Sequence, residues 1–287
     1  MTVITINDIL DILNSAAPFA LAESWDNVGL LVGSPHQEVK AILVALDPGD
    51  AILEEAISLG IDTIITHHPV IFKPLTAINT GEAQGQLLAK ALTHGIAIIA
   101  CHTNLDSARN GVSDILCRRL GLDEIVPLTL DPASAATGTG IGRIGLYRPP
   151  LSAAQFLHRL HQGLELDQVL TAGKLPEMIT RVAVCGGSGS EFAPLAQKLG
   201  ADLFLSAEIK HSTAIWAIEN RFCVIDGSHY ATEKPAVALL VETLHRAIAE
   251  KGWQIPVTPA AKEHHPFAHL NINPQSSKQQ TVRGESF

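Results

Sequence analysis

Three short polar clusters of this 287-residue chain contain histidine, and two of them also contain carboxylate side chains. They are Thr-His-His-Pro at residues 66–69, Cys-His-Thr-Asn-Leu-Asp at 101–106, and a third run, from aspartate to glutamate, at 226–233. Imidazole and carboxylate groups are the ligands that suit Zn, Mn, Fe or Ni in proteins. We therefore expect the three clusters to meet at one metal site.

Each cluster directly follows a run of apolar and β-branched residues, at 61–65, 96–100 and 222–225. Continuous apolar runs of this length, separated by helical segments, are typical of buried strands in an α/β sheet. Ligands and catalytic groups collect at the carboxyl ends of such strands. The sequence thus predicts an α/β fold with the polar clusters at the strand ends.

Spacing within the clusters suggests how the side chains are used. Consecutive strand residues point to opposite faces, so the rings of His67 and His68 can serve different metal ions; the alternative is a solvent-facing pair on a loop. His229 and Glu233 are four residues apart at the start of a helix and share one face. The alternative there is an ordinary helix start, where the dipole favours a glutamate.

In the second cluster, more than one role is open for Asp106 and for His102. Asp106 is either a ligand or the N-cap of the helix expected near Gly111. His102 is either a ligand, or else a hydrogen-bond partner of a bound group or a proton shuttle. We prefer the latter roles for His102, because metal-bound groups usually need such partners.

The chain is organised by an internal duplication. A strand at 42–47, a helix at 51–59 and a Gly-x-Asp strand at 60–66 are matched by segments at 182–186, 191–199 and 200–206. Each set then leads to a histidine and an acid four residues apart, followed by an amphipathic helix, at 111–120 and 235–251. Such self-similarity indicates two related halves. We place the first half at residues 1–125, with 222–257 packing near its metal site, the second at 126–257, and a polar C-terminal extension at 258–287.

Composition restricts the class of protein. The chain is 46% hydrophobic and 17% charged, which is typical of a soluble globular protein, and its net charge of −9 disfavours nucleic acid as a partner. Its four cysteines form no CxxC pair, which favours reduced thiols and a cytoplasmic location. We find no signal peptide and no apolar run of about 18 residues, so we expect no membrane span.

Four further patterns carry weaker signals. Residues 140–145 match GxGxxG, but no helix follows the third glycine, so a dinucleotide site is disfavoured. Residues 186–190 could bind an anion on backbone amides, but a tight turn is favoured. We interpret the histidines at 264–265 as part of a surface tail. Glu208 and His211 fall where the second half would carry its counterpart of the first cluster.

Five motifs, in order, resemble one known family. Residues 24–33 (SWDNVGLLVG), 66–69, 102–106, 140–145 and 229–233 are similar to the GTP cyclohydrolase I type 2 homologs, also called the Nif-three-like family. The resemblance runs from about Thr5 to about Val257. It implies a fold of two similar, intertwined α/β halves with mixed sheets, and a ring-like homohexamer. It also implies that the metal ligands are His67, His68, Asp106, His229 and Glu233.

Two features distinguish this chain within the resemblance. The segment between the two halves is too short for the large domain that some members insert there, so this is the compact form. Pro48 directly after Asp47 and the polar extension depart from the family pattern.

Two hypotheses for function follow. Five ligands are too few for two separate sites, so two divalent ions, roughly 3.5–4 Å apart, would share a carboxylate, for which Glu233 is the best candidate. Such a pair suits a hydrolase of nucleotide-like or phosphoester substrates, with His102 moving a proton. Trp25, Asp26 and Asn27 would contact a base, and Glu208 could face the substrate. The alternative is a non-catalytic metal-binding scaffold, a metallochaperone or a regulatory protein.

Overall fold

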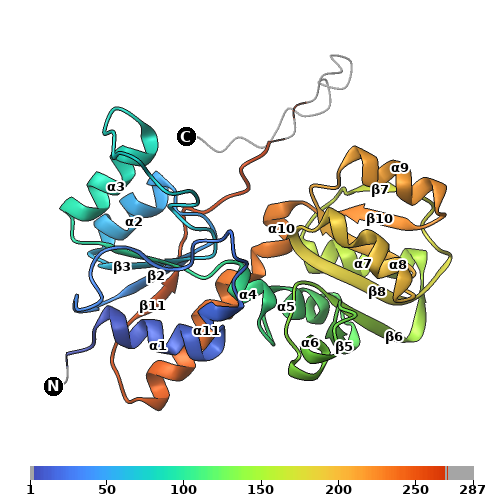
Figure 1. Ribbon diagram of the computed structural model, residues 1–287, viewed down its shortest axis with the longest axis horizontal. Helices are drawn as coiled ribbons and strands as arrows, with labels where there is room; N and C mark the ends of the chain where they lie inside the picture. Colours follow the sequence, from blue (N-terminus) through green and yellow to red (C-terminus); the bar gives the residue numbers. More distant parts are fainter. Residues whose placement is uncertain (1–2, 269, 271–287) are drawn as a thin grey trace, which may run out of the picture.

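The computed structural model describes residues 3–268 and residue 270, which form two α/β lobes joined at their centre (Figure 1). The sheet of the first lobe has the order β1 (Gly29–Val32), β4 (Ala97–Ala100), β3 (Thr63–Thr66), β2 (Ile42–Ala45) and β11 (Val257–Pro259). The sheet of the second lobe has the order β5 (Asp123–Pro127), β6 (Arg143–Ser152), β8 (Met178–Ser188), β9 (Leu203–Ala207), β10 (Cys223–Asp226) and β7 (Leu170–Ala172). Both sheets are mixed, as predicted.

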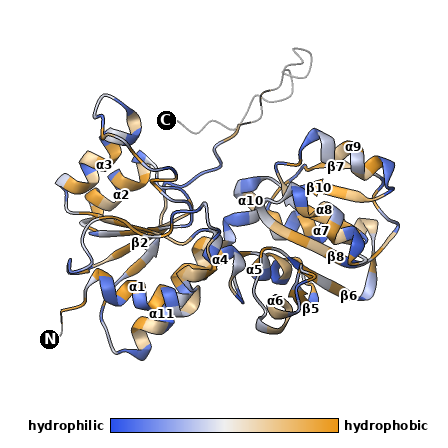
Figure 2. Cartoon of the chain, viewed as in Figure 1, coloured by the Kyte–Doolittle hydropathy of each residue, from blue (hydrophilic) through white to orange (hydrophobic). Residues whose placement is uncertain are grey.

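Helices cover both faces of each sheet, and this explains the continuous apolar runs in the strands. In β2, Ile42 and Val44 belong to one hydrophobic cluster, whereas Leu43 and Ala45 belong to another. Because both faces are buried, no polar residue alternates along the strand. The strands are accordingly hydrophobic in Figure 2, and polar residues lie on the outer faces of the helices.

The first sheet packs against α1 (Ile6–Ala16) and α11 (Pro235–Glu250) on one face and α2 (Asp50–Leu59) and α3 (Ala83–Thr93) on the other. The second sheet packs against α5 (Val112–Arg119) and α7 (Ala153–Leu164) on one face and α8 (Ala193–Lys198) and α9 (His211–Glu219) on the other. The short elements that remain are η1 (Phe19–Leu21), α4 (Thr103–Ser107), α6 (Pro132–Thr137), η2 (Ser190–Phe192) and α10 (His229–Glu233).

Local signals fix several helix ends. The Ser152 hydroxyl accepts a hydrogen bond from the Gln155 amide and the Gln155 side chain returns to the Ser152 backbone, a capping box that starts α7. Pro235 occupies the first turn of α11, where its missing N–H has no intrahelical role. α2 ends at Gly60, whose φ of +67° lies in the left-handed region that glycine adopts without strain.

The duplication is present in three dimensions, and the halves are intertwined. β2, β3 and β4 are parallel neighbours, as are β8, β9 and β10, and each set gains one antiparallel strand beside its last member. The helices that follow are exchanged. α5 follows β4 but contacts β6 and β8, whereas α11 follows β10 but contacts β2 and β11. The chain therefore crosses between the lobes at α4 and again at α10.

This exchange corrects the expected boundaries. β5 begins at Asp123 and already pairs within the second sheet, so the first half does not extend to residue 125. Residues 235–259 lie in the first lobe, near whose metal site the segment 222–257 was expected to pack, because Leu240 and Leu244 of α11 join the hydrophobic cluster of α1. The extension does not begin at 258 as a separate tail, since β11 includes residues 258–259. Residues 271–287 of that extension lie outside the described residues. None of the helices in the described part of the chain is both long and apolar enough to cross a membrane.

Candidate metal centre

The register of the parallel strands brings the polar clusters together. Thr66 at the end of β3 pairs with Ala100 at the end of β4, so the residues that follow them leave the sheet side by side. These residues are the histidine pair 67–68 and His102. α10, at the crossing between the lobes, brings the third cluster from the second sheet (Figure 1). The candidate centre thus lies where the two lobes meet.

Glu233 stands between two groups of ligands and presents one oxygen to each. Its Oε2 lies 3.0 Å from His68 Nε2 and 2.8 Å from His229 Nε2. Its Oε1 lies 3.8 Å from His67 Nε2, which in turn is 3.7 Å from Asp106 Oδ1. Each set of three therefore places its ligand atoms within 4.8 Å of one another. We call them the His68 group (His68, His229, Glu233) and the His67 group (His67, Asp106, Glu233).

Buried polar atoms that lack hydrogen bonds lie in both groups. Within the described residues these atoms include His67 Nε2, Asp106 Oδ1 and Glu233 Oε2. Glu233 Oε2 is close to two imidazole nitrogens, but neither contact has hydrogen-bond geometry. Leaving such atoms unpaired in the interior is costly. Divalent cations would satisfy all of them, so this donor set fits metal ions.

Each histidine at the centre is held through its Nδ1 atom by an oxygen acceptor. The distances are 2.8 Å from His67 to Cys101 O, 2.8 Å from His68 to Asp47 Oδ1, 2.9 Å from His229 to Glu208 Oε1, and 2.8 Å from His102 to Asp26 Oδ1. Because these acceptors are carbonyl or carboxylate oxygens, Nδ1 is the donor and carries the proton. In the neutral form of each ring, the Nε2 lone pair is then available to a metal or a proton.

His102 lies beside the histidine pair without belonging to either group around Glu233. Its ring centre is 5.2 Å from that of His67 and 5.4 Å from that of His68. Its supporting carboxylate, Asp26, is fully buried and also accepts from the backbone and hydroxyl of Thr103. Burial alone would raise the pKa of Asp26, but the hydrogen bonds from His102 and Thr103 outweigh it and hold that pKa well below its usual range.

The carboxylates and imidazoles at the centre shift one another's pKa values. Burial raises the pKa of Asp106 above its usual range, although the nearby imidazoles oppose this. Burial also disfavours ionised Glu233, but its three histidine neighbours outweigh burial and lower its pKa. Burial lowers the pKa of His68, yet its contacts with Asp47 and Glu233 prevail and raise that pKa to about 10. In the protein without ions, the His68 ring is therefore protonated on both nitrogens and positively charged at neutral pH.

The structure corrects two of the expected substrate contacts. The Asp26 carboxylate is used up by His102 and Thr103, and Asn27 Nδ2 donates to Ile71 O at 2.6 Å. The Asp26 carboxylate is therefore engaged within the protein, and the Asn27 amide nitrogen helps to fix the loop. Trp25 is 57% exposed, and its ring centre lies 5.8 Å from that of Phe72 and 6.2 Å from that of His102. Trp25 thus remains available beside the centre.

Of the two second-half residues expected near the site, Glu208 contacts a candidate ligand and His211 does not. Glu208 has a left-handed φ of +51°, and its carboxylate accepts from His229. It is also 61% exposed at its side chain, so it orients a ligand while facing solvent. His211 is exposed at the start of α9 and is not among the residues brought to either group.

The other motifs have structural roles. Asp106 lies within α4, and Gly111 is the N-cap of α5, so the N-cap interpretation of Asp106 is wrong. The GxGxxG run leads into β6 with no helix after it, and its Arg143 is buried against Asp114. Residues 186–188 are the end of β8 and not a tight turn.

Sequence reasoning missed several residues that shape the centre. Asp47 holds His68, and it follows the buried strand β2 just as the recognised clusters follow theirs, which was a usable signal. Gly187 leaves room for Glu233, and no sequence signal pointed to that contact. His265 was assigned to a surface tail, but its Nε2 lies 2.8 Å from Ser228 Oγ, so that assignment is wrong.

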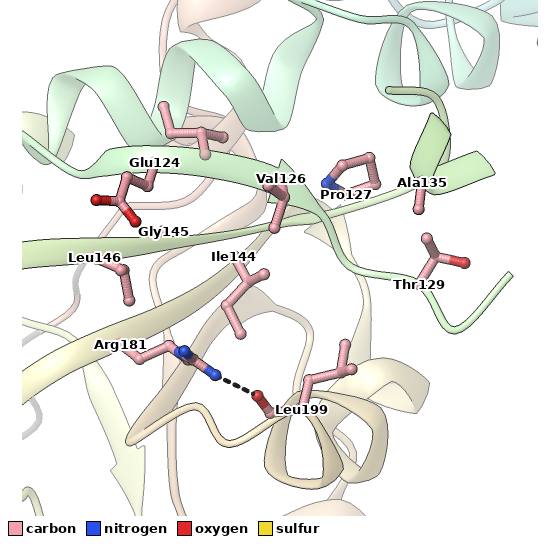
Figure 3. A pocket seen from close by; sticks show the side chains of 11 residues that line it. Glu124, Val126, Pro127, Thr129, Ala135, Ile144, Gly145, Leu146, Arg181 and Leu199 are labelled. Carbon is pink, nitrogen blue, oxygen red and sulfur yellow. Dashed lines mark hydrogen bonds between the residues drawn. The ribbon is translucent and has the colours of Figure 1, made fainter. Parts of the chain in front are cut away.

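A separate pocket of about 580 Å³ lies in the second lobe, away from these residues. It is enclosed by β5, β6, β8 and the end of α8, and Arg181 Nη1 donates to Leu199 O at its edge (Figure 3). Its lining includes Val126, Ile144 and Leu146, and it contains none of the ligand candidates. The pocket therefore does not belong to the metal centre.

Comparisons with known proteins identify the family and the fold of this chain. The sequence profile of the family described as Duf34/NIF3 (NGG1p interacting factor 3) matches residues 4–266. A GTP cyclohydrolase 1 type 2 homolog of Streptomyces coelicolor is 32% identical, covering 95% of this chain and 97% of that protein. One from a Nostoc species is 36% identical over 74% of this chain and 80% of its own length. The crystal structure of the hypothetical protein SA1388 of Staphylococcus aureus has a TM-score of 0.85 at 29% identity, covering 94% of this chain and all of that one.

Proposed function

Since this chain belongs to the Duf34/NIF3 family, we propose that it is a hydrolase dependent on two divalent metal ions, acting on a nucleotide-like or phosphoester substrate. Its relatives are named as homologs of a GTP cyclohydrolase, a hydrolytic enzyme, which fits this class of reaction. Fold and family do not name a substrate, so the chemistry of the centre itself must indicate one.

The observation that carries the proposal is the position of Glu233 between the two groups. The two ends of one carboxylate face separate sets of nitrogen and oxygen donors. His68 and His229 with Oε2 would hold one ion, and His67 and Asp106 with Oε1 would hold the other. Divalent ions held there would supply Lewis acidity and bring the pKa of water toward about 7.

The chain's own residues support acid–base chemistry at this centre. The Asp26 carboxylate fixes the His102 tautomer that carries its proton on Nδ1, so Nε2 is the atom that can accept a proton. His102 stands next to the histidine pair, so a group held by His67 or by His68 would lie beside its ring. We assign His102 as the residue that takes a proton during hydrolysis and returns it to the leaving group.

The exposed aromatic residues beside His102 favour a substrate with a planar group. Trp25 and Phe72 are 57% and 44% exposed, although both are large apolar side chains. The Asp26 and Asn27 contacts fix the loop that carries Trp25, so its ring projects from a fixed stretch of backbone. Stacking on a rigid aromatic ring contributes roughly 1–3 kcal/mol per base, regardless of its identity.

Metal analysis followed by a substrate panel tests the proposal. We expect two ions per chain after loading with a single metal, and turnover of at least one nucleotide or phosphoester by a loaded form. Chelation should abolish turnover, and adding the same metal back should restore it, which controls for damage by the chelator.

The outcomes separate the competing hypotheses. Fewer than two ions per chain would contradict the dinuclear assignment. Two ions without turnover of any substrate in the panel would favour a metal-binding scaffold, a metallochaperone or a regulatory protein. The hexameric ring and the cytoplasmic location stay predictions from the resemblance and composition.

A further inference from the structure

Residues 260–267, which we call the strap, run along the first lobe and reach the second at the metal centre. The strap continues from β11, which pairs in parallel with β2. Its first residue, Ala260, donates a backbone hydrogen bond to Val44 O at 2.8 Å. The buried carboxylate of Glu55 then accepts from the amides of Ala261 and Lys262, at 2.8 and 2.9 Å. The start of the strap is therefore fixed to the first lobe.

Glu263 connects the strap to one ligand of the His68 group. Its Oε1 atom accepts hydrogen bonds from the backbone amides of Leu46 and Asp47, the latter at 3.0 Å. Asp47 in turn accepts from His68 Nδ1 through its own carboxylate, at 2.8 Å. Glu263 therefore fixes the backbone from which the supporting carboxylate of His68 projects.

His265 connects the strap to the other histidine of the same group. Its Nε2 lies 2.8 Å from Ser228 Oγ, and its ring centre is 5.2 Å from that of Tyr230. Ser228 has a φ of +66° and a ψ of 133°, a conformation that is strained for a non-glycine residue and persists only where its surroundings fix it. The next residue is His229, so this strained turn sets where its imidazole points.

We propose that the strap is the positioning element of the His68 group, with Glu263 acting through Asp47 and His265 acting through Ser228. This inference rests on the proposed two-ion centre. The His67 group is supported differently, by the carbonyl of Cys101 and by α4, and within the described residues the strap makes no hydrogen bond to it. Loss of a strap contact should therefore weaken one ion selectively.

The test compares strap variants with adjacent controls, using Co²⁺ as the probe. Glu263→Ala removes the acceptor of the Leu46 and Asp47 amides, and His265→Ala removes the contacts with Ser228 and Tyr230. Lys262→Ala and His264→Ala change exposed side chains one position away, and His265→Gln keeps an amide that can bond Ser228. His229→Ala and Asp106→Ala provide reference spectra for protein that lacks one ion or the other. Co²⁺ titrations followed by absorption then give an affinity for each group.

We expect Glu263→Ala and His265→Ala to weaken the Co²⁺ ion of the His68 group by about 10-fold, the low end of the range for residues that orient ligands. The ion of the His67 group, both control variants and His265→Gln should change by less than about 3-fold, well below that range. Melting of the ion-free variants shows whether they fold. A strap variant that does not fold leaves the other variant and His265→Gln to decide the outcome.

Equal loss of affinity for both ions, or no change for either, would refute the proposed role of the strap while leaving the two-ion centre intact. Wild-type protein that binds fewer than two Co²⁺ ions would instead refute the proposed centre, and the selective effect of the strap with it. The two failures are therefore distinguishable from the wild-type titration alone.

Discussion

A Cβ atom on Gly187 would lie 1.9 Å from Glu233 Oε1, so the shared carboxylate occupies the space that a side chain at 187 would fill. Gly187 stands near the end of β8, with a φ of +62°, and its amide donates to Thr232 Oγ1 at 3.0 Å. The second sheet thus supports α10 from behind and leaves room only for glycine. The glycine-rich run at 186–190 therefore serves the placement of Glu233.

Gly187→Ala should remove both metal ions, because the added methyl group displaces the carboxylate that faces both groups. Metal content after loading is the measurement. Gly60→Ala is the matched control, since Gly60 has a φ of +67° with open space around its Cβ position. Both changes carry backbone strain of about 1–2 kcal/mol, so only the displacement of Glu233 differs. Two ions retained in Gly187→Ala would contradict this prediction.

Glu233→Ala should also lose both ions, whereas variants of a ligand that belongs to one group only should each lose chiefly one. His229→Ala removes a donor from the His68 group alone, and Asp106→Ala removes one from the His67 group alone. Metal analysis after dialysis against a weak chelator measures the number retained. If all three variants lose the same number of ions, Glu233 is not the shared ligand.

Ion binding should release protons at neutral pH. Burial lowers the pKa of His68, but its carboxylate contacts raise it to about 10, so an ion entering the His68 group displaces a proton. Affinity should therefore rise with pH up to about 10. In the ion-free protein, rising pH has the opposite effect on folding stability. The stability contributed by protonated His68 is complete below about pH 6.5 and is lost as pH rises through 10. Calorimetry in buffers of different ionisation enthalpy measures the release, and buffer-independent heats would contradict it.

Arg143 should be a major contributor to stability. Its guanidinium is buried, donates to Asp114 Oδ2 at 2.7 Å, and donates to the carbonyls of Ala108 and Gly142. Arg143→Ala leaves the Asp114 charge buried and should lower the free energy of unfolding by about 3–5 kcal/mol. Arg148→Ala breaks an exposed ion pair with Glu124 and should cost no more than about 1 kcal/mol. Urea unfolding compares the two, and equal effects would refute the assignment.

The strands and the positions of the candidate ligands were predictable because their signals are local. A strand buried on both faces gives a continuous apolar run, and the residues after its carboxyl end can be identified without knowing the partners. The exchange of α5 and α11 was not predictable in this way. An amphipathic pattern defines the apolar face of a helix but not the sheet against which that face packs.

The residues missed at the centre depend on contacts distant in sequence. Asp47 and His68 meet only because β2 and β3 pair in register, and His265 reaches Ser228 across the two lobes. For Asp26 and Asn27 the location was predicted, but not the hydrogen bonds by which they fix the loop. A polar side chain near a site can bind a ligand or fix the backbone, and only its actual hydrogen-bond partners decide between these roles.

His102→Ala should slow turnover while both ions are retained, because a proton carrier affects the rate and not the binding of metal. General acid–base groups contribute about 10²–10⁴-fold, so kcat should fall within that range. Asp26→Asn should also lower kcat with ions retained, since the carboxylate that fixes the His102 tautomer is lost. His94→Ala, a change of an exposed histidine at the end of α3, is the control and should leave kcat unchanged. Metal analysis and steady-state kinetics on the same samples decide the matter: if His102→Ala loses an ion, His102 is itself a ligand, as its closeness to the histidine pair would permit.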